Sequence, residues 1–200
     1  MTYLEEYYDL IKSGGVIVGY WIRKEIENLI ADLNDPAYIY DTTEANKRIK
    51  FMQTLCLQSK QPYYMKPVNL MPWQKAFWEA VYSFKIAETG ERRFTEGLLL
   101  VARKNGKSTM FAADGNFDLF VGEGGTDICC ASNDDRQAKL IWKEIAGMRS
   151  RLDPRKLITG QNLTEITNRE KILPFFFYRQ KRKTKTDLIY RKHILMNRTT

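Results

Sequence analysis

The sequence has 200 residues, 44% of them apolar and 12% aromatic, which is enough to bury a core and excludes a chain disordered throughout. Its cysteines, Cys56, Cys129 and Cys130, form no CxxC pair, and a single histidine adds little toward a zinc site. We therefore expect a reduced, cytoplasmic protein. No apolar run is long enough to cross a bilayer, so no membrane association is expected.

The formal net charge of +8 is concentrated at the C-terminal end. Residues 171–200 contain nine Lys and Arg against one acid, Asp187. Subtracting these from the totals of 32 and 24 leaves 23 basic and 23 acidic residues in 1–170. A basic tail binds nucleic acid electrostatically, so one hypothesis is a non-catalytic nucleic-acid-binding module.

Residues 1–70 read as an N-terminal helical segment. One helix is predicted from apolar residues at three- and four-residue steps, ended by the Asn-Asp-Pro at 34–36; the apolar residues are Ile22, Ile26, Leu29, Ile30 and Leu33. A second helix is predicted over 43–57. A third starts near Pro72, and its core face is predicted to consist of Trp73, Phe77, Val81 and Phe84.

Strands and helices alternate from residue 97 onward. The pattern predicts a buried strand over 97–101, a helix over 107–120, a strand over 126–131 and a helix over 133–151. Asn133 or Asp134 could cap the last helix, whose apolar stripe is Ala138, Ile141, Ile145, Met148 and Leu152. This order predicts an α/β fold with a parallel sheet and flanking helices.

The stretch LLVARKNGKST, residues 99–109, ends in Gly-Lys-Ser between the predicted strand and helix. Backbone N–H groups and the helix dipole converge there, as a phosphate site requires, although Val101 stands where the GxxxxGK[ST] pattern has its first glycine. Gly106 allows close approach of a phosphate, Lys107 reaches the β and γ oxygens, and the Ser108 hydroxyl suits Mg²⁺. The alternative is a basic surface turn.

Two further loop residues carry chemistry. Thr109 is a second hydroxyl for the metal, and Arg103 is a cation that could bind the γ-phosphate and stabilise charge during transfer. The predicted cofactors are ATP and Mg²⁺.

With ARKNGKS at Ala102–Ser108, the chain resembles the large terminase subunit of tailed bacteriophages, in the branch whose phosphate loop lacks the first glycine. The resemblance implies catalytic roles for Arg103 and Lys107. It implies a nucleotide site made of Gln74, Ala102, Arg103, Lys104, Asn105, Gly106, Lys107, Ser108 and Thr109. Gln74 lies in LMPWQK, where the family reads adenine; a solvated helix residue is the alternative.

The stretch CCASNDDRQAKLIWKEIAGM also resembles the family's second strand and following helix. Arg136 could act on a neighbouring subunit, with Gln137 at a matched position, or Arg136 could be a solvated charge. The family uses ATP hydrolysis to drive DNA into procapsids. The implied partners are double-stranded phage DNA, the portal protein, the small terminase subunit and further copies of the chain, in the cytoplasm of a bacterial host.

A P-loop ATPase also needs an Asp-Glu pair at the end of a second strand. After Asp153 the only acids are Glu165, Glu170 and Asp187, none of them following an apolar run, and the family's nuclease domain is absent. We therefore expect an incomplete P-loop NTPase with a helical segment over 1–70, a partial ATPase domain over 71–170 and a tail over 171–200. We expect this chain to be truncated and to be inactive alone. Another P-loop NTPase, such as a helicase-like protein, is an alternative.

The abrupt charge change near Lys171 indicates a shift of reading frame. The codons of Phe175–Phe177 are rich in T and prone to slippage. In the frame that starts at the third codon base, residues 193–197 can read Tyr-Phe-Asp-Glu, and the Glu is forced by the codons of Met196 and Asn197. We expect the tail to be a frameshifted reading with no packing reason to fold; the alternative is a genuine DNA-binding tail.

Overall fold

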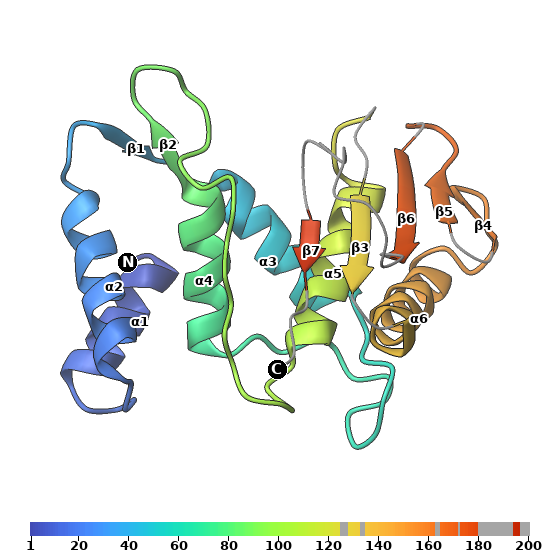
Figure 1. Ribbon diagram of the computed structural model, residues 1–200, viewed down its shortest axis with the longest axis horizontal. Coiled ribbons are helices and arrows are strands. Elements are labelled where there is room, and N and C mark those ends of the chain that lie inside the picture. The colour runs from blue at the N-terminus through green and yellow to red at the C-terminus, as the bar shows by residue number, and fades with distance from the viewer. Residues whose placement is uncertain (125–127, 133–134, 163–164, 172, 180–193, 197–200) are drawn as a thin grey trace. The chain divides into compact units, whose positions relative to one another are not determined.

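The computed structural model describes residues 1–124, 128–132, 135–162, 165–171, 173–179 and 194–196 (Figure 1). The chain forms two compact units. Unit 1 consists of Met1–Phe51 and Asn69–Leu100, and unit 2 of Met52–Val68 and Val101–Thr200. No helix in the described part of the chain has both the length and the apolar character needed to cross a bilayer.

Unit 1 is mainly helical. It contains α1 (Tyr3–Lys12), α2 (Tyr20–Asp32), the first part of α3 (Thr43–Leu55) and α4 (Pro72–Ser83). The sequence did not predict its small antiparallel sheet of β1 (Tyr38–Tyr40) and β2 (Phe84–Ile86). The core of this unit comprises Leu4, Tyr7, Ile11, Ile26, Leu29, Ala76, Ala80 and Phe84.

The buried face of α4 differs from the predicted one. Phe84 is fully buried at the start of β2, but Trp73, Phe77 and Val81 are only half-buried. The face that is buried carries Gln74, Ala76, Trp78, Glu79, Ala80, Tyr82 and Ser83. The prediction was partly wrong because aromatic residues lie on both sides of α4, and the side with small alanines allows the closer approach of α1.

Glu79 is a buried carboxylate that holds the start of α1. Leu4 N–H donates to Glu79 Oε2 (2.6 Å), and the side chain is 1% exposed. Burial raises the pKa of Glu79 above its ordinary value of 4.5, against the opposing effect of the bonds from the Leu4 and Tyr3 N–H groups. The folded state therefore binds this proton more tightly than the unfolded state does.

A raised pKa implies that Glu79 costs stability as the pH rises from 4.5 through its folded pKa. We expect Glu79→Gln, which keeps an acceptor for Leu4 N–H, to remove this part of the pH dependence. Urea unfolding of both proteins at intervals from pH 4 to 8 measures the difference. The raised pKa of Glu79 is refuted if the free energy of unfolding of Glu79→Gln falls with pH as steeply as that of the wild type.

Unit 2 is an α/β layer with a five-stranded sheet. Its elements are α5 (Lys107–Phe120), β3 (Ile128–Ser132), α6 (Asp135–Leu152), β4 (Thr159–Gln161), β5 (Glu165–Asn168), β6 (Leu173–Arg179) and β7 (Ile194–Met196). The strand order is β4-β5-β6-β3-β7. Strand β3 pairs in parallel with β6 and β7, whereas β5 pairs antiparallel with β4 and β6. The α/β class is confirmed, but the sheet is mixed instead of wholly parallel.

The two helices of unit 2 match their predicted ranges closely. Helices α5 and α6 pack against each other and against the sheet. Ile141, Ile145 and Met148 of the predicted stripe are buried in α6, while Leu152 is half-buried. The predicted capping residues 133–134 and the side chain of Ala138 lie outside the described part of the structure.

The predicted buried strand over 97–101 is wrong. These residues pair with no strand in the part of the chain that the structure describes, and Leu98 and Leu100 are 78% and 77% exposed. The segment joins unit 1 to unit 2. An apolar run becomes a strand only when a neighbour supplies ladder hydrogen bonds, and that requirement cannot be read from the run itself.

Strand β6 extends the packed region beyond residue 170. Phe175 is fully buried, pairs with Ile128 of β3 and lies 6.0 Å from Trp142 between ring centroids. Lys171 Nζ donates to the carbonyls of Phe120 (3.1 Å) and Gly122 (2.9 Å). The expectation that the chain has no packing partners from Lys171 onward is therefore wrong for Lys171 and Phe175, and the backbone of β6 pairs with β3 as far as Arg179.

Gly115 of α5 gives a direct test of β6 packing. A Cβ added at Gly115 would lie 2.8 Å from Phe175 Cε2, whereas one at Gly147 of α6 would lie 3.8 Å from Ser59 Cβ. We expect Gly115→Ala to destabilise the chain by about 1–3 kcal/mol through overpacking. Gly147→Ala is the matched control and should stabilise by roughly 0.5–1 kcal/mol, because alanine favours helix interiors. Equal unfolding midpoints for Gly115→Ala and wild type would contradict the packing of Phe175.

Candidate functional site

The backbone of the loop before α5 is shaped by two residues in the left-handed region. Lys104 has φ +69°, and Gly106, the N-cap of α5, has φ +73°. Glycine adopts this conformation without strain, which explains why Gly106 is needed. Val101 is not among the described residues that have a positive φ, so the backbone at this position does not need a glycine.

The start of α5 leaves backbone donors available. No side chain caps this end of the helix, and the first N–H groups of any helix have no partner within it. Ala102 to Gly106 are exposed, while Lys107, Ser108 and Thr109 are half-buried. Together with the helix dipole, these donors make a site for an anion.

Two side chains of the loop bond to its own backbone. Asn105 Nδ2 donates to the carbonyls of Ala102 (3.1 Å) and Arg103 (3.5 Å). Lys107 Nζ donates to the carbonyl of Val101, six residues earlier. The sequence gives no signal for either contact, and both brace the loop from within.

The loop lies at a defined end of unit 2. The carboxyl ends of the parallel strands β3, β6 and β7 point toward the end of the unit where α5 begins (Figure 1). Ligands of open α/β sheets bind at this edge. The residues fit a nucleotide: the loop offers amide donors and a lysine for phosphates, and a hydroxyl at Ser108 for a metal ion.

Gln74 is buried in unit 1, with 5% of its surface exposed. The alternative interpretation of Gln74 as a solvated helix residue is therefore wrong. Its Oε1 accepts a hydrogen bond from Met71 N–H (2.9 Å), which caps the start of α4. Because the oxygen is engaged, recognition of a base by Gln74 would depend on its Nε2 donor. The nucleotide role of Gln74 stays a prediction.

The structure describes the remaining predicted residues only in part. Arg136 and Gln137 lie in the first turn of α6, but their side chains are outside the described part of the structure. Of the three late acids, Glu165 begins β5 and Glu170 follows it, whereas Asp187 is outside the described residues. No cluster of three or more metal-binding side chains occurs among the described residues.

Comparison with known proteins identifies the family. The profile of "Terminase large subunit, ATPase domain" matches residues 72–175, just over half of the chain. No curated protein matches the sequence. The chain is similar in fold to the crystal structure of the HK97 bacteriophage large terminase, with 23% identity and a TM-score of 0.58; the match covers 74% of this chain and 30% of that one.

The profile match includes α4, the loop, α5, β3, α6 and the first part of β6, so it contains the candidate site and most of unit 2. The similarity in fold to the solved terminase extends further, over 74% of the chain. The chain belongs to the family of the terminase large subunit ATPase domain.

Proposed function

We propose that Ala102–Thr109 binds the phosphates of ATP together with Mg²⁺. The observation that carries the proposal is the left-handed Gly106 at the start of the uncapped helix α5, followed by Lys107 and Ser108. This arrangement directs backbone donors and a cation to one point. The family match supports nucleotide binding in general terms.

Each side chain of the loop has a proposed role. Lys107 leaves the Val101 carbonyl and binds the β and γ oxygens, and Arg103, which is exposed, binds the γ-phosphate. The Ser108 hydroxyl is a ligand of the metal, with Thr109 as the second candidate. When bound, Mg²⁺ neutralises charge on the β- and γ-phosphates. Ala102, Lys104 and Asn105 shape the loop around them.

We propose that the whole protein is a motor that uses ATP to move double-stranded phage DNA into a procapsid in a bacterial host. Its partners would be the portal protein, the small terminase subunit and further copies of the chain. The match covers 30% of the HK97 large terminase, so this chain corresponds to a part of such a protein. The alternative of a non-catalytic basic module is not favoured, because the profile match is to an ATPase domain.

We also propose that the reading frame changes near Phe175–Phe177. The profile match that ends at residue 175 and the burial of Phe175 support a native sequence up to this point. In the alternative frame the codons of residues 193–197 can encode Tyr-Phe-Asp-Glu, which would supply the acidic pair that the given frame lacks. Sequencing the gene tests the proposal: stop codons in the alternative frame would reject it.

Gln74→Glu tests whether the site selects adenine. Glutamate keeps an oxygen acceptor for Met71 N–H but loses the amide donor. We expect about tenfold weaker binding of ATP relative to GTP, since a hydrogen bond of about 1–1.5 kcal/mol is lost only with adenine. Titration of both nucleotides measures the ratio. If ATP and GTP lose affinity equally, Gln74 does not read the base.

A further inference from the structure

A long stretch that includes most of α3 and the following loop contains basic residues and no acidic ones. Residues 45–78 contain no Asp or Glu; their cations are Lys47, Arg48, Lys50, Lys60, Lys66 and Lys75. The balance of charge in 1–170 is therefore not uniform. Within unit 2 this stretch forms the 58–66 loop, which closes through Gln58 N–H to the Lys66 carbonyl (2.8 Å) and Met65 N–H to the Gln58 carbonyl (2.9 Å).

The 58–66 loop is fixed to α6. Glu144, whose side chain is 3% exposed, bonds to Ser59 Oγ and to Lys60 Nζ. Arg151 Nη1 donates to the Leu57 carbonyl (3.3 Å) just before the loop, and its guanidinium lies 5.4 Å from the centre of the Tyr64 ring. These anchors hold the loop in one place on the helix, which reduces the ordering cost of binding a partner.

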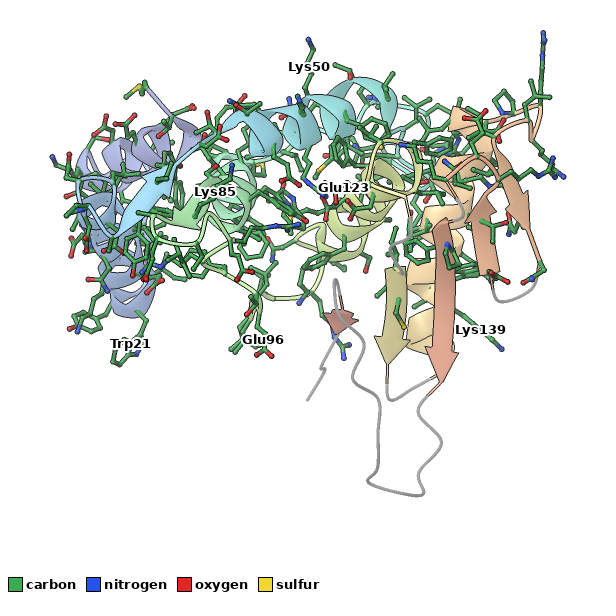
Figure 2. The ribbon with its side chains drawn as sticks, turned by 90° about the horizontal axis from the view of Figure 1, so that it is seen from above. Trp21, Lys50, Lys85, Glu96, Glu123 and Lys139 are labelled. Atoms are coloured by element: carbon green, nitrogen blue, oxygen red, sulfur yellow. The ribbon has the colours of Figure 1, made fainter. Side chains whose placement is uncertain are left out.

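The helix continues the positive surface of the loop. Lys139, Lys143, Gly147 and Arg151 follow one another at four-residue steps and therefore share one face of α6. Lys139 and Lys143 are exposed, and Lys139 projects outward in Figure 2. Gly147 lies beneath Ser59 of the loop. At 1.5 Å per residue, the row is about 18 Å long.

The tip of the loop adds exposed aromatic surface. Tyr63, Tyr64 and Met65 are 54%, 51% and 48% exposed, and Lys66 Nζ lies 5.9 Å from the centre of the Tyr63 ring. The one acid that the structure describes among residues 52–68 and 139–152 is Glu144, which is buried and paired. Over these two ranges the described surface has lysines, an arginine and tyrosine hydroxyls and no exposed carboxylate, a composition that complements phosphates. Asp135, which begins α6 four residues before Lys139, has its side chain outside the described part of the structure.

We infer that the 58–66 loop and the Lys139–Arg151 row of α6 form a surface that binds the backbone of duplex DNA without needing nucleotide. The charge and the tyrosines specify a phosphate-bearing polymer, and the choice of DNA rests on the proposed function. Lys66, Lys139 and Lys143 contact phosphates, while Tyr63 and Tyr64 donate to them or contact sugars. The contacts are to the backbone, so no base sequence is selected.

The test compares two triple variants of the full chain by fluorescence anisotropy with a labelled 30-base-pair duplex, without ATP and at several salt concentrations. Lys66, Lys139 and Lys143 are changed to Gln in one. Lys12, Arg23 and Lys24, exposed cations of unit 1, are changed to Gln in the other. Both remove three charges, and the cations of residues 171–200 give both the same background.

We expect the first variant to reduce the slope of log Kd against log salt by about 2 to 3, since each lost phosphate contact removes about 0.9. The control variant should keep the wild-type slope. Equal slopes in the two variants would overturn the inference and assign binding to charge in general. Failure of the wild type to bind DNA would overturn it too, whereas loss of ATP binding would count only against the proposed function.

Discussion

Lys107→Ala should weaken ATP binding about a hundredfold. The amine is the charged donor of the loop placed at the first residue of α5, beside the backbone N–H groups that would bind the same phosphates. A hydrogen bond to a charged group contributes about 1.5–3 kcal/mol, and more than one phosphate oxygen lies within reach of a flexible lysine. At 1.4 kcal/mol per factor of ten, these losses give about two orders of magnitude.

Isothermal titration with ATP and Mg²⁺ measures this effect. Lys104→Ala is the matched control, since Lys104 is an exposed cation of the same loop, and alanine at φ +69° experiences similar strain. We expect Lys104→Ala to change ATP affinity less than tenfold. If Lys107→Ala binds ATP as the wild type does, Ala102–Thr109 is not a phosphate loop.

Steady-state ATP hydrolysis by the 200-residue polypeptide should be slower by several powers of ten than that of an ATPase with a complete site. Strand β3 lies between β6 and β7, and no acid directly follows either neighbour: Gln180 and Lys181 follow β6 in the sequence, and Asn197 and Arg198 follow β7. Without a carboxylate to hold Mg²⁺ and another to orient water, positioning of the nucleophile is lost. Loss of members of a catalytic set typically costs several powers of ten.

A coupled phosphate-release assay at saturating ATP tests the expectation, with Lys107→Ala as the background control. Hydrolysis by the purified wild type that Lys107→Ala abolishes would contradict it, because the site would then contain a catalytic acid in the given reading frame. A rate that Lys107→Ala leaves unchanged would come from a contaminant. ATP binding is expected in either case, so binding and hydrolysis are measured on the same preparation.

The sequence predicted helices α5 and α6 well, because the signals for these helices are local. A glycine followed by Lys-Ser at the start of an apolar helical pattern specifies its own backbone, and α5 begins and ends at the predicted residues Lys107 and Phe120. The stripe of Ile141, Ile145 and Met148 in α6 is local as well. Such patterns depend on neighbours three or four residues away.

Features that depend on distant partners were missed. The apolar run over 97–101 has the composition of a strand but pairs with none among the described residues. Conversely, Phe175 looked like part of an unfolded tail, yet it packs beside Gly115 and Trp142, which are far away in sequence. The burial of Gln74 likewise depends on how α4 meets the rest of unit 1. None of these contacts leaves a periodic trace in the sequence.

The bond from Lys107 Nζ to the Val101 carbonyl implies that the proposed binding of nucleotide would exchange one acceptor of the amine for another. An incoming phosphate would gain only the difference between its own bond to the amine and the internal bond that it displaces. Because a single phosphate brings less negative charge to the amine than three phosphates do, we expect AMP to be a poor competitor of ATP even though both carry the same base.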